Sequence, residues 1–201
     1  MMKKIVLDCD GVLLDYNETY GRVLNNFFQK KISIKDSLAY HAENYYDVVW
    51  KNNTERETFF EYFNIHGWSN MKALPKALEA TQLLKDMGYH ICVVTSIPQT
   101  AKNMRKTNLL ELGFPIDEVI ATGKKEGLNN PKKKYIENIS PEYFVDDLLV
   151  NFQDINSSTN FVLIDIPAKD NPNNLLKNTI SLHSEHYSLW NFVQQHLINK
   201  K

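Results

Sequence analysis

From residue 75 to the C-terminal end, short apolar segments alternate with segments of helical spacing, and no other feature constrains the fold as much. We expect the apolar segments to be strands, at residues 90–95, 117–121, 142–146, 160–166 and, more weakly, 179–182. A chain that alternates strands with helices builds a parallel sheet with right-handed crossovers and helices on both faces. The sequence therefore predicts a doubly wound, Rossmann-like α/β core.

The segments between these strands have apolar residues three and four positions apart, the spacing of an amphipathic helix. Pro75 is expected to open the first helix, and Gly88 is its expected C-terminal cap. Further helices are expected near residues 98–112, 132–139 and 186–198. These helices would cover the two faces of the sheet.

A first strand is expected at residues 3–8, where a continuous apolar centre suits a strand covered on both faces. It is followed by a long stretch of polar and aromatic residues, with one helix expected at 16–30 and two or three short helices over 36–68. This stretch is too long for an ordinary strand-to-helix connection. We therefore predict a small all-helical cap inserted after the first strand. The predicted boundaries are 16–70 for the cap, and 1–15 with 71–201 for the core.

The formal net charge of the chain is -1, which offers no electrostatic attraction for nucleic acids or anionic membranes. No segment approaches the length that spans a bilayer, and the apolar run after Lys3 and Lys4 is too short for a signal peptide. Cys9 and Cys92 lie in apolar strand-like segments, so a disulfide scaffold is not expected. We therefore expect a cytoplasmic protein that binds a small molecule. The composition favours no oligomeric state.

Two aspartates lie two residues apart at the end of the first predicted strand. Asp8 and Asp10 point the same way if the backbone is extended. Two carboxylates this close repel each other, and a hard divalent cation such as Mg²⁺ relieves that repulsion. Gly11 allows a sharp turn after the pair. A simple β-turn at Asp10-Gly11 explains the same residues without any chemistry.

The strand predicted at 90–95 ends in Thr95-Ser96. In open α/β sheets, ligands bind at the carboxyl ends of the strands. A hydroxyl group there can donate to a phosphate oxygen. The alternative is that Ser96 caps the helix that begins near Pro98.

The strand predicted at 142–146 ends in Asp146-Asp147, and three lysines, Lys132-Lys133-Lys134, precede it. Adjacent carboxylates at the end of a buried strand are costly without a counter-charge, although either can cap a following helix. One lysine could reach the carboxylates and balance a bound phosphate. At least one or two of the three face solvent, because successive helical residues point in different directions.

The order strand–Asp-x-Asp-Gly, strand–Thr, Lys, strand–Asp-Asp resembles the haloacid dehalogenase-like (HAD) superfamily. The resemblance extends from residue 3 to about residue 154, and its most specific motif is Val6-Leu7-Asp8-Cys9-Asp10-Gly11-Val12-Leu13. Members with a helical cap carry it between the first and second motifs, as the insertion predicted here would be.

This resemblance implies a phosphatase that forms an aspartyl-phosphate. Asp8 would attack phosphorus, and Asp10 would protonate the leaving oxygen and then activate water. Mg²⁺ would be held by the Asp8 carboxylate, the Asp10 backbone carbonyl and Asp147, with Asp146 beside them. Asp146 stands where glycine is common in the family, and Asn151 stands where a further aspartate is common. Dehalogenases that resemble this fold lack the second aspartate, so Asp10 favours phosphate esters over haloacids.

The resemblance also assigns the phosphate contacts. Thr95, with Ser96 beside it, would bond the transferring phosphoryl group. Lys132 or Lys133 would offset the charge on the nucleophile and the phosphate. Much of the rate would then come from positioning and charge neutralisation.

Three segments look like the 5′-nucleotidases of the deoxyribonucleotidase type: residues 68–75 with the helix after them, Thr95-Ser96, and 145–147. Lys76 departs from that pattern, where glycine is usual. We therefore favour nucleoside monophosphates as substrates, with sugar phosphates or phosphoglycolate-like molecules as the alternative. A non-catalytic HAD-like binding module is the competing class of function. The cap aromatics could stack on a base or form a small core. The polar cap candidates for substrate contact are Arg22, His41, Lys51 and Arg56.

Overall fold

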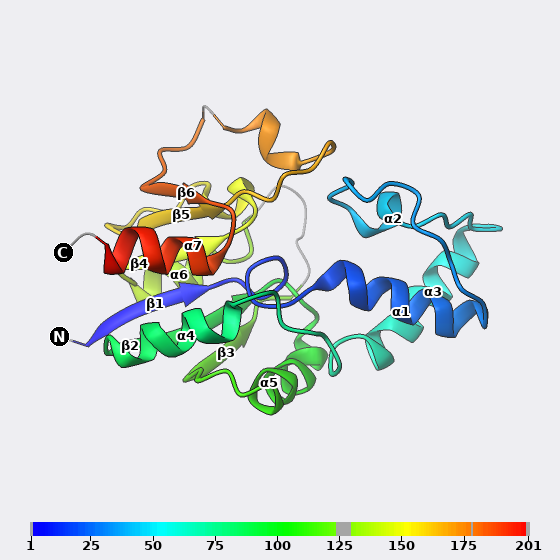
Figure 1. The fold of residues 1–201 in the computed structure, drawn as a ribbon, viewed down its shortest axis with the longest axis horizontal. Coiled ribbons are helices and arrows are strands. Elements are labelled where there is room, and N and C mark those ends of the chain that lie inside the picture. The colour runs from blue at the N-terminus through cyan, green and yellow to red at the C-terminus, as the bar shows by residue number, and fades with distance from the viewer. Residues whose placement is uncertain (1, 124–129, 178, 200–201) are drawn as a thin grey trace.

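A computed structural model of the chain describes residues 2–123, 130–177 and 179–199. At its centre is a parallel sheet with the strand order β3-β2-β1-β4-β5-β6 (Figure 1). The strands are β1 (Lys3–Leu7), β2 (Tyr89–Thr95), β3 (Glu118–Ala121), β4 (Tyr143–Asp146), β5 (Asn160–Ile164) and β6 (Ser184–His186). The chain runs from the central β1 to one edge of the sheet and then returns to build the other edge. This order confirms the predicted doubly wound, Rossmann-like α/β fold.

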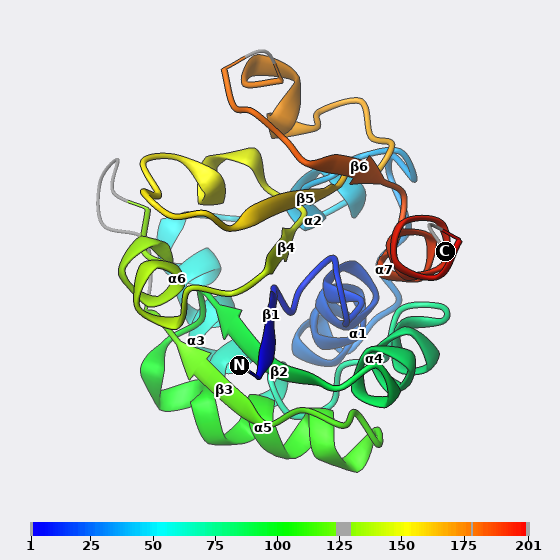
Figure 2. The same cartoon turned by 90° about the vertical axis from the view of Figure 1, so that its left-hand side faces the viewer.

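The helices of the core cover both faces of the sheet (Figure 2). They are α4 (Ala77–Asp86), α5 (Lys102–Glu111), α6 (Lys133–Ile139) and α7 (Leu189–Phe192), with 3₁₀ turns η1 (Gln99–Ala101), η2 (Leu149–Phe152) and η3 (Pro172–Leu175) and a π-helical end η4 (Val193–Ile198). Successive residues of a strand serve opposite faces. Ile5 and Leu7 belong to the apolar cluster under α4 and α7, whereas Val6 belongs to the cluster under α6. The continuous apolar runs of the sequence are explained by this coverage on both faces.

The C-terminal part of the sheet differs from the prediction. Residues 179–182 are not a strand; β6 forms at Ser184–His186 and pairs in parallel with β5. Ile180 and Leu182 instead pack on the second apolar cluster as a loop. The last helix begins at Leu189 rather than at 186, because 184–186 are strand and the Ser188 hydroxyl accepts from the Asn191 backbone N–H at 3.2 Å as an N-cap.

Three helices follow β1 before the chain returns to the core: α1 (Tyr16–Phe28), α2 (Ala42–Tyr45) and α3 (Asn53–His66). They lie beyond the carboxyl ends of the strands, on the right in Figure 1. Side-chain caps set two of their starts, since Asp15 accepts from the backbone of Glu18 and Asn52 from that of Glu55, both at 2.9 Å. Several aromatic rings of this segment form a core of their own.

That aromatic core centres on Tyr20, Phe59 and Phe63, which are fully buried. The ring centroids of Tyr20 and Phe59 lie 5.1 Å apart in an edge-to-face arrangement. Gly21 lets the neighbouring backbone approach this core, because a Cβ there would lie 2.1 Å from the ring of Tyr46. These rings are therefore occupied in packing and are not available to stack on a ligand.

The residue before α4 has an unusual backbone conformation. Lys76 has φ +64°, in the left-handed region that glycine adopts most easily. The turn geometry that would select glycine is thus present although the residue is lysine.

Among the described residues, none of the helices combines the length and the apolar character that crossing a membrane requires.

Candidate active site

The sheet register brings the aspartates of β1 and β4 together. Leu7 pairs with Val145, and the backbone N–H of Asp8 donates to the carbonyl of Val145 at 2.8 Å. Asp8 and Asp147 therefore leave adjacent strand ends on the same edge of the sheet. Oxygen atoms of Asp8, Asp146 and Asp147 all lie within 4.8 Å of one another, and all three side chains are buried. We call these three residues the acidic cluster.

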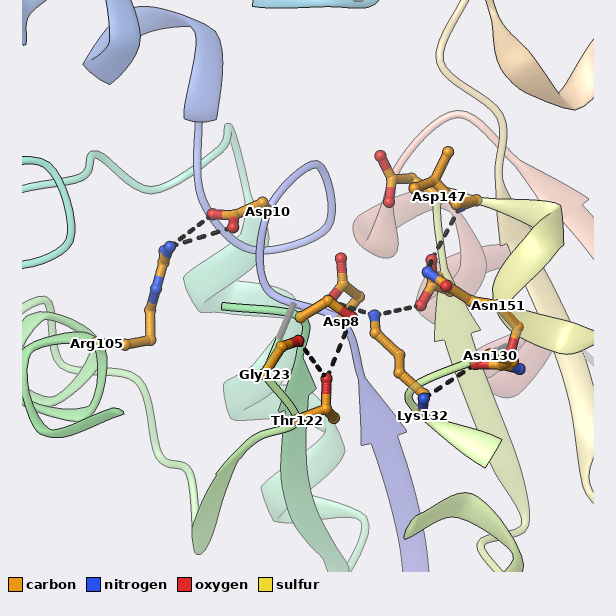
Figure 3. A network of polar contacts seen from close by, with 12 residues as sticks. Asp8, Asp10, Arg105, Thr122, Gly123, Asn130, Lys132, Asp147 and Asn151 are labelled. Atoms are coloured by element: carbon orange, nitrogen blue, oxygen red, sulfur yellow. Dashed lines mark hydrogen bonds and ion pairs between the residues drawn. The ribbon is translucent and has the colours of Figure 1, made fainter. Parts of the chain in front are cut away.

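Lys132 is the lysine that joins the acidic cluster (Figure 3). Its Nζ atom lies 2.5 Å from Asp8 Oδ1 and 2.6 Å from Asp146 Oδ2, and its side chain is 1% exposed. Burial works against the charged ammonium, but the Asp146 and Asp8 carboxylates outweigh it and raise the pKa of Lys132. Lys133 points elsewhere, with Nζ 3.9 Å from Glu137 on an exposed surface. Of the two candidate lysines, only Lys132 thus reaches the carboxylates.

Asp146 has both oxygens engaged by the protein. Oδ1 accepts from the Leu148 backbone N–H at 2.9 Å and from Asn151 Nδ2 at 2.8 Å, while Oδ2 faces Lys132. Burial raises the pKa of Asp146 to about 6, against the opposing effect of Lys132. Asn151, which stands where the family often has an aspartate, here supplies a donor instead of another negative charge. Asp146 thus holds Lys132 in place and accepts from the backbone of the turn after β4, but it does not cap the following 3₁₀ helix, which begins after Leu148 without a side-chain cap.

Asp147 is the member of the acidic cluster without a basic neighbour. Within the described ranges, no lysine or arginine forms an ion pair with it; its Oδ2 accepts from the hydroxyl of Tyr40 at 2.6 Å. Burial, followed by the charges of Asp8 and Asp146, raises the pKa of Asp147 well above its ordinary value. A buried carboxylate in this state is one that a cation would stabilise.

The donor set of the acidic cluster fits a hard divalent cation. Three buried carboxylates face a single ammonium group, so negative charge is left uncompensated around Asp8 and Asp147. Oxygen-only ligation by one or two carboxylates is what Mg²⁺ prefers. Because both Asp146 oxygens already accept hydrogen bonds, Asp8 and Asp147 are the side chains best placed to hold the ion.

Gly11 is required by the way the β1 loop approaches Asp147. Its φ is +82°, and a Cβ at this position would lie 2.3 Å from Asp147 Oδ2. Any side chain here would meet both backbone strain and the carboxylate. The glycine of the Asp-x-Asp-Gly motif therefore allows β1 and β4 to present their carboxylates side by side.

Asp10 points away from Lys132 and toward α5 (Figure 3). Arg105 Nη2 lies 2.9 Å from Asp10 Oδ1 and donates to Oδ2 at 3.1 Å. Arg105 is fully buried, and its guanidinium lies 5.2 Å from the centroid of the Trp68 ring. Burial raises the pKa of Asp10, while Arg105 opposes the rise. A carboxyl group in this setting can exchange a proton with a ligand in the adjoining cavity.

Sequence reasoning missed Arg105 and Tyr40. A signal for Arg105 was present in the helix predicted near residues 98–112. Arg105 lies four residues from both Ala101 and Leu109, so it falls on the apolar stripe that faces the sheet. A buried arginine on an apolar stripe indicates a buried acidic partner. Tyr40 offered no such signal, because it lies in a loop among other aromatic residues.

Thr95 and Ser96 are at the end of β2, beside the acidic cluster. Thr95 is 1% exposed and lines the same cavity as Asp8 and Lys132. Ser96 also lines it, and its hydroxyl accepts from Thr122 Oγ1 at 3.4 Å. Ser96 does not cap the following helix, since η1 begins after Pro98 without a side-chain cap. Both residues thus border the space in which a ligand would lie.

A cavity of about 570 Å³ opens above the acidic cluster. This volume lies within the usual range of small-molecule sites. Its far wall comes from the segment after β1 and from the loop after β5, including Tyr16, Tyr40, Tyr45, His41 and residues 166–168. Of the four polar candidates of the predicted cap, only His41 lines the cavity. Arg22, Lys51 and Arg56 instead contact Asn70, Glu55 and Glu43, respectively.

No protein-family model and no curated protein matches this chain. Solved structures match over nearly its whole length. A "predicted phosphatase" from Clostridium acetobutylicum superposes with a TM-score of 0.61 at 16% identity, covering 98% of this chain and 99% of its own. L-2-haloacid dehalogenase from Xanthobacter autotrophicus gives 0.60 at 12% identity, with 98% and 100% covered. A "predicted phosphoglycolate phosphatase" from Haemophilus somnus gives 0.58 at 14%, with 96% and 97% covered.

These likenesses establish that the chain has the haloacid dehalogenase-like fold. This is the fold that the resemblance in motif order implies. At such low sequence identity these matches establish only the fold, because proteins with one fold can have many different activities. The case for a function therefore depends on the acidic cluster and the cavity above it.

Proposed function

We propose that this protein is a Mg²⁺-dependent phosphatase that hydrolyses small phosphate monoesters through an aspartyl-phosphate on Asp8. The observation that carries the proposal is the position of Asp8. Asp8 lines the cavity, its Oδ1 atom lies 2.5 Å from the Lys132 ammonium, and its carboxylate comes within 4.8 Å of the uncompensated carboxylate of Asp147. A phosphate group in this cavity would meet a nucleophile, a fixed positive charge and two hydroxyl donors.

Each residue of the site has a role in this reaction. Asp8 attacks phosphorus with a carboxylate oxygen, and the leaving alcohol takes a proton from Asp10. Asp10 then removes a proton from the water that releases phosphate from Asp8. Lys132 holds the Asp8 carboxylate in place and offsets charge on the phosphate, while Thr95 and Ser96 donate to its oxygens. Mg²⁺, held by Asp8 and Asp147, would neutralise charge that develops on the transferring group.

The second aspartate supports ester hydrolysis over dehalogenation. A halide leaves without a proton, so a dehalogenase needs no acid at position 10. Asp10 lines the cavity, and burial raises its pKa, which favours the protonated form that an acid requires. The names of the structural neighbours include both activities, and Asp10 is the residue of this chain that separates them.

Nucleoside monophosphates are the substrates we favour. Supporting observations are the size of the cavity and the aromatic side chains of Tyr16, Tyr40 and Tyr45 in its wall. We propose that residues 16–70 act as a cap that selects the leaving group, since the wall opposite Asp8 comes partly from this segment. Phosphoglycolate-like and sugar phosphates are the alternative, favoured by the neighbour named as a phosphoglycolate phosphatase. A panel of phosphorylated metabolites, compared by kcat/KM, would rank the two classes.

The test is hydrolysis of para-nitrophenyl phosphate with and without Mg²⁺, by the wild type and by Asp8→Asn. We expect Mg²⁺-dependent turnover by the wild type and at least about a thousandfold loss in the variant, because an amide is a poor nucleophile. Lys133→Gln is the matched control, since Lys133 points away from the cavity. A wild-type protein that binds Mg²⁺ without turnover would identify the competing function, a non-catalytic binding module.

A further inference from the structure

A second set of polar contacts joins α2 and the segment before it to the core, outside the acidic cluster. Residues 165–177, which follow β5, reach the loop at residues 36–44 (Figure 1). Asp170 accepts from the backbone N–H of Tyr40 through Oδ1 and from Asn44 Nδ2 through Oδ2, the latter at 2.7 Å. We call residues 36–44 the cap loop and residues 165–177 the bridging segment.

Lys169 adds two contacts between the same segments. Its Nζ atom lies 2.9 Å from Asp36 Oδ2, and its backbone N–H donates to the carbonyl of Leu38 at 2.9 Å. The cap loop is therefore held by backbone and side-chain bonds at Asp36, Leu38, Tyr40 and Asn44. This fixes where the Tyr40 side chain enters the cavity.

The bridging segment also holds Asp147 through its main chain. Asn173 Nδ2 donates to the carbonyl oxygen of Asp147 at 2.8 Å, and the Leu149 backbone N–H donates to Asn173 Oδ1 at 2.8 Å. Asn173 is 1% exposed. The bridging segment thus contacts both the cap loop and the turn that carries Asp147.

The two lines of contact meet at Asp147, one at its backbone carbonyl and the other at its carboxylate. Tyr40, held by Asp170, donates its hydroxyl to Asp147 Oδ2 at 2.6 Å. Asp147 has no basic partner among the described residues, so this hydroxyl sets the direction of its carboxylate. Partners that orient a ligating carboxylate typically change metal affinity or activity by about 10- to 100-fold when removed.

We propose that Tyr40 is a positioning residue that couples the seating of the cap loop to cation binding at Asp147. The inference rests on the proposed function only in taking Asp147 as a ligand of the divalent cation. Because linkage is reciprocal, a seated cap loop strengthens cation binding, and a bound cation strengthens the seating of the cap loop. Substrate binding under the cap loop and cation binding at Asp147 are then no longer independent events.

The first test is isothermal titration of Mg²⁺ into the wild type, Tyr40→Phe and Tyr62→Phe. Tyr62 is the matched control, because it lies in α3 and packs on Phe27 and His66, outside the cavity. We expect Kd to rise about tenfold or more in Tyr40→Phe and to change less than about twofold in Tyr62→Phe. Circular dichroism and thermal melts confirm folding. A Kd for Tyr40→Phe within twofold of the wild type, or a wild type that binds no Mg²⁺, would overturn the proposal.

The second test uses amide hydrogen exchange of the same proteins. In the wild type, Mg²⁺ is expected to slow exchange across residues 36–45, and in Tyr40→Phe this Mg²⁺-dependent slowing is lost. A merely structural role for Tyr40 would change exchange equally with and without Mg²⁺. Asp170→Ala, which removes two of the bonds to the cap loop but neither the Lys169 bonds nor the Tyr40 hydroxyl, is expected to weaken Mg²⁺ binding by a smaller factor. An unchanged Kd in that variant would contradict the coupling.

These results are independent of turnover. A wild type that binds Mg²⁺ but hydrolyses nothing would refute the proposed function and leave the coupling intact. An active enzyme in which Tyr40→Phe binds Mg²⁺ normally would refute the coupling and leave the proposed function intact.

Discussion

Two buried ion pairs flank the first strand, and they differ in what each cation does. Lys132 bridges two carboxylates, Asp8 and Asp146, at the ends of adjacent strands and is 1% exposed. Arg105 serves one carboxylate, Asp10, whose side chain is still 24% exposed. The Lys132 ammonium therefore neutralises carboxylates that solvent barely reaches. The arginine pair restrains a carboxylate that still borders the cavity, as its proposed role of general acid requires.

The largest effect should come from removing the lysine. Lys132→Met leaves Asp8 and Asp146 buried without their counter-charge, which we expect to lower the free energy of unfolding by about 3–5 kcal/mol. Lys133→Met should change it by less than about 0.5 kcal/mol, because that side chain is exposed. Urea denaturation of both variants measures the difference. Equal losses in the two variants would mean that Lys132 is not the charge that stabilises the strand ends.

A smaller effect is expected from Gly11→Ala, which places a Cβ 2.3 Å from the Asp147 Oδ2 atom. Gly88→Ala is the matched control, because Gly88 has a similar φ of +84° but nothing within 4 Å of a new Cβ. Both variants carry the left-handed strain of about 1–2 kcal/mol. Only Gly11→Ala should also weaken Mg²⁺ binding. Similar Mg²⁺ affinities in the two variants would show that the close approach to Asp147 has no consequence for the cation.

Arg105→Met tests the other side of the comparison. Because the Asp10 side chain is 24% exposed, solvent partly replaces the lost guanidinium, and we expect a moderate loss of unfolding free energy, about 1–3 kcal/mol, less than for Lys132→Met. Arg105 lowers the pKa of Asp10, so its removal raises that pKa further. The folded state then keeps a proton that the unfolded chain releases, and stability falls as the pH rises above the ordinary carboxyl range. Denaturation measured at several pH values checks this sign; a loss as large as that for Lys132→Met would erase the distinction between the pairs.

The smallest effect belongs to an ion pair outside the site. Lys85 Nζ lies 2.6 Å from Asp117 on a partly exposed surface. Although burial opposes it, the hydrogen bonds from Lys85 and the Ile91 backbone hold the pKa of Asp117 below its ordinary value. The contribution of this ion pair to the free energy of unfolding is present above the ordinary carboxyl pKa and is lost as the pH falls through the lowered pKa of Asp117. Asp117→Asn should cost no more than about 1 kcal/mol near neutral pH, by urea denaturation. A larger cost would mean that the solvent exposure of the ion pairs does not determine the order of their contributions to stability.

Much of the sheet was predictable because it depends on local patterns. Apolar runs covered on both faces mark β1, β2, β4 and β5, and parallel order then brings Asp8 and Asp147 to one edge. The weak sixth strand was misplaced, since its three residues, Ser184–His186, carry no apolar run and pair only because β5 offers an edge. Local patterns locate strands with a buried centre and fail for a polar edge strand.

The site was predictable to the extent that it lies on strand ends. The choice between Lys132 and Lys133 needed the observed start of α6, because successive residues point in different directions. Tyr40 contacts Asp147 across 107 positions and Arg105 contacts Asp10 across 95. The Tyr40 contact depends on how the segment at 16–70 packs on the sheet, and periodicity contains no information about that packing. The Arg105 contact joins α5 to the loop after β1; the inward stripe of that helix indicates that Arg105 is buried but does not identify Asp10 as its partner.

The central claim is that Asp8 is a nucleophile beside a divalent cation shared with Asp147. A crystal structure with Mg²⁺ and beryllium fluoride, a mimic of an acyl-phosphate, tests it most directly. The account predicts beryllium fluoride on an Asp8 carboxylate oxygen, Mg²⁺ between Asp8 and Asp147, and Lys132 still in contact with the Asp8 side chain. Beryllium fluoride on Asp10, or Mg²⁺ bound away from Asp147, would contradict it.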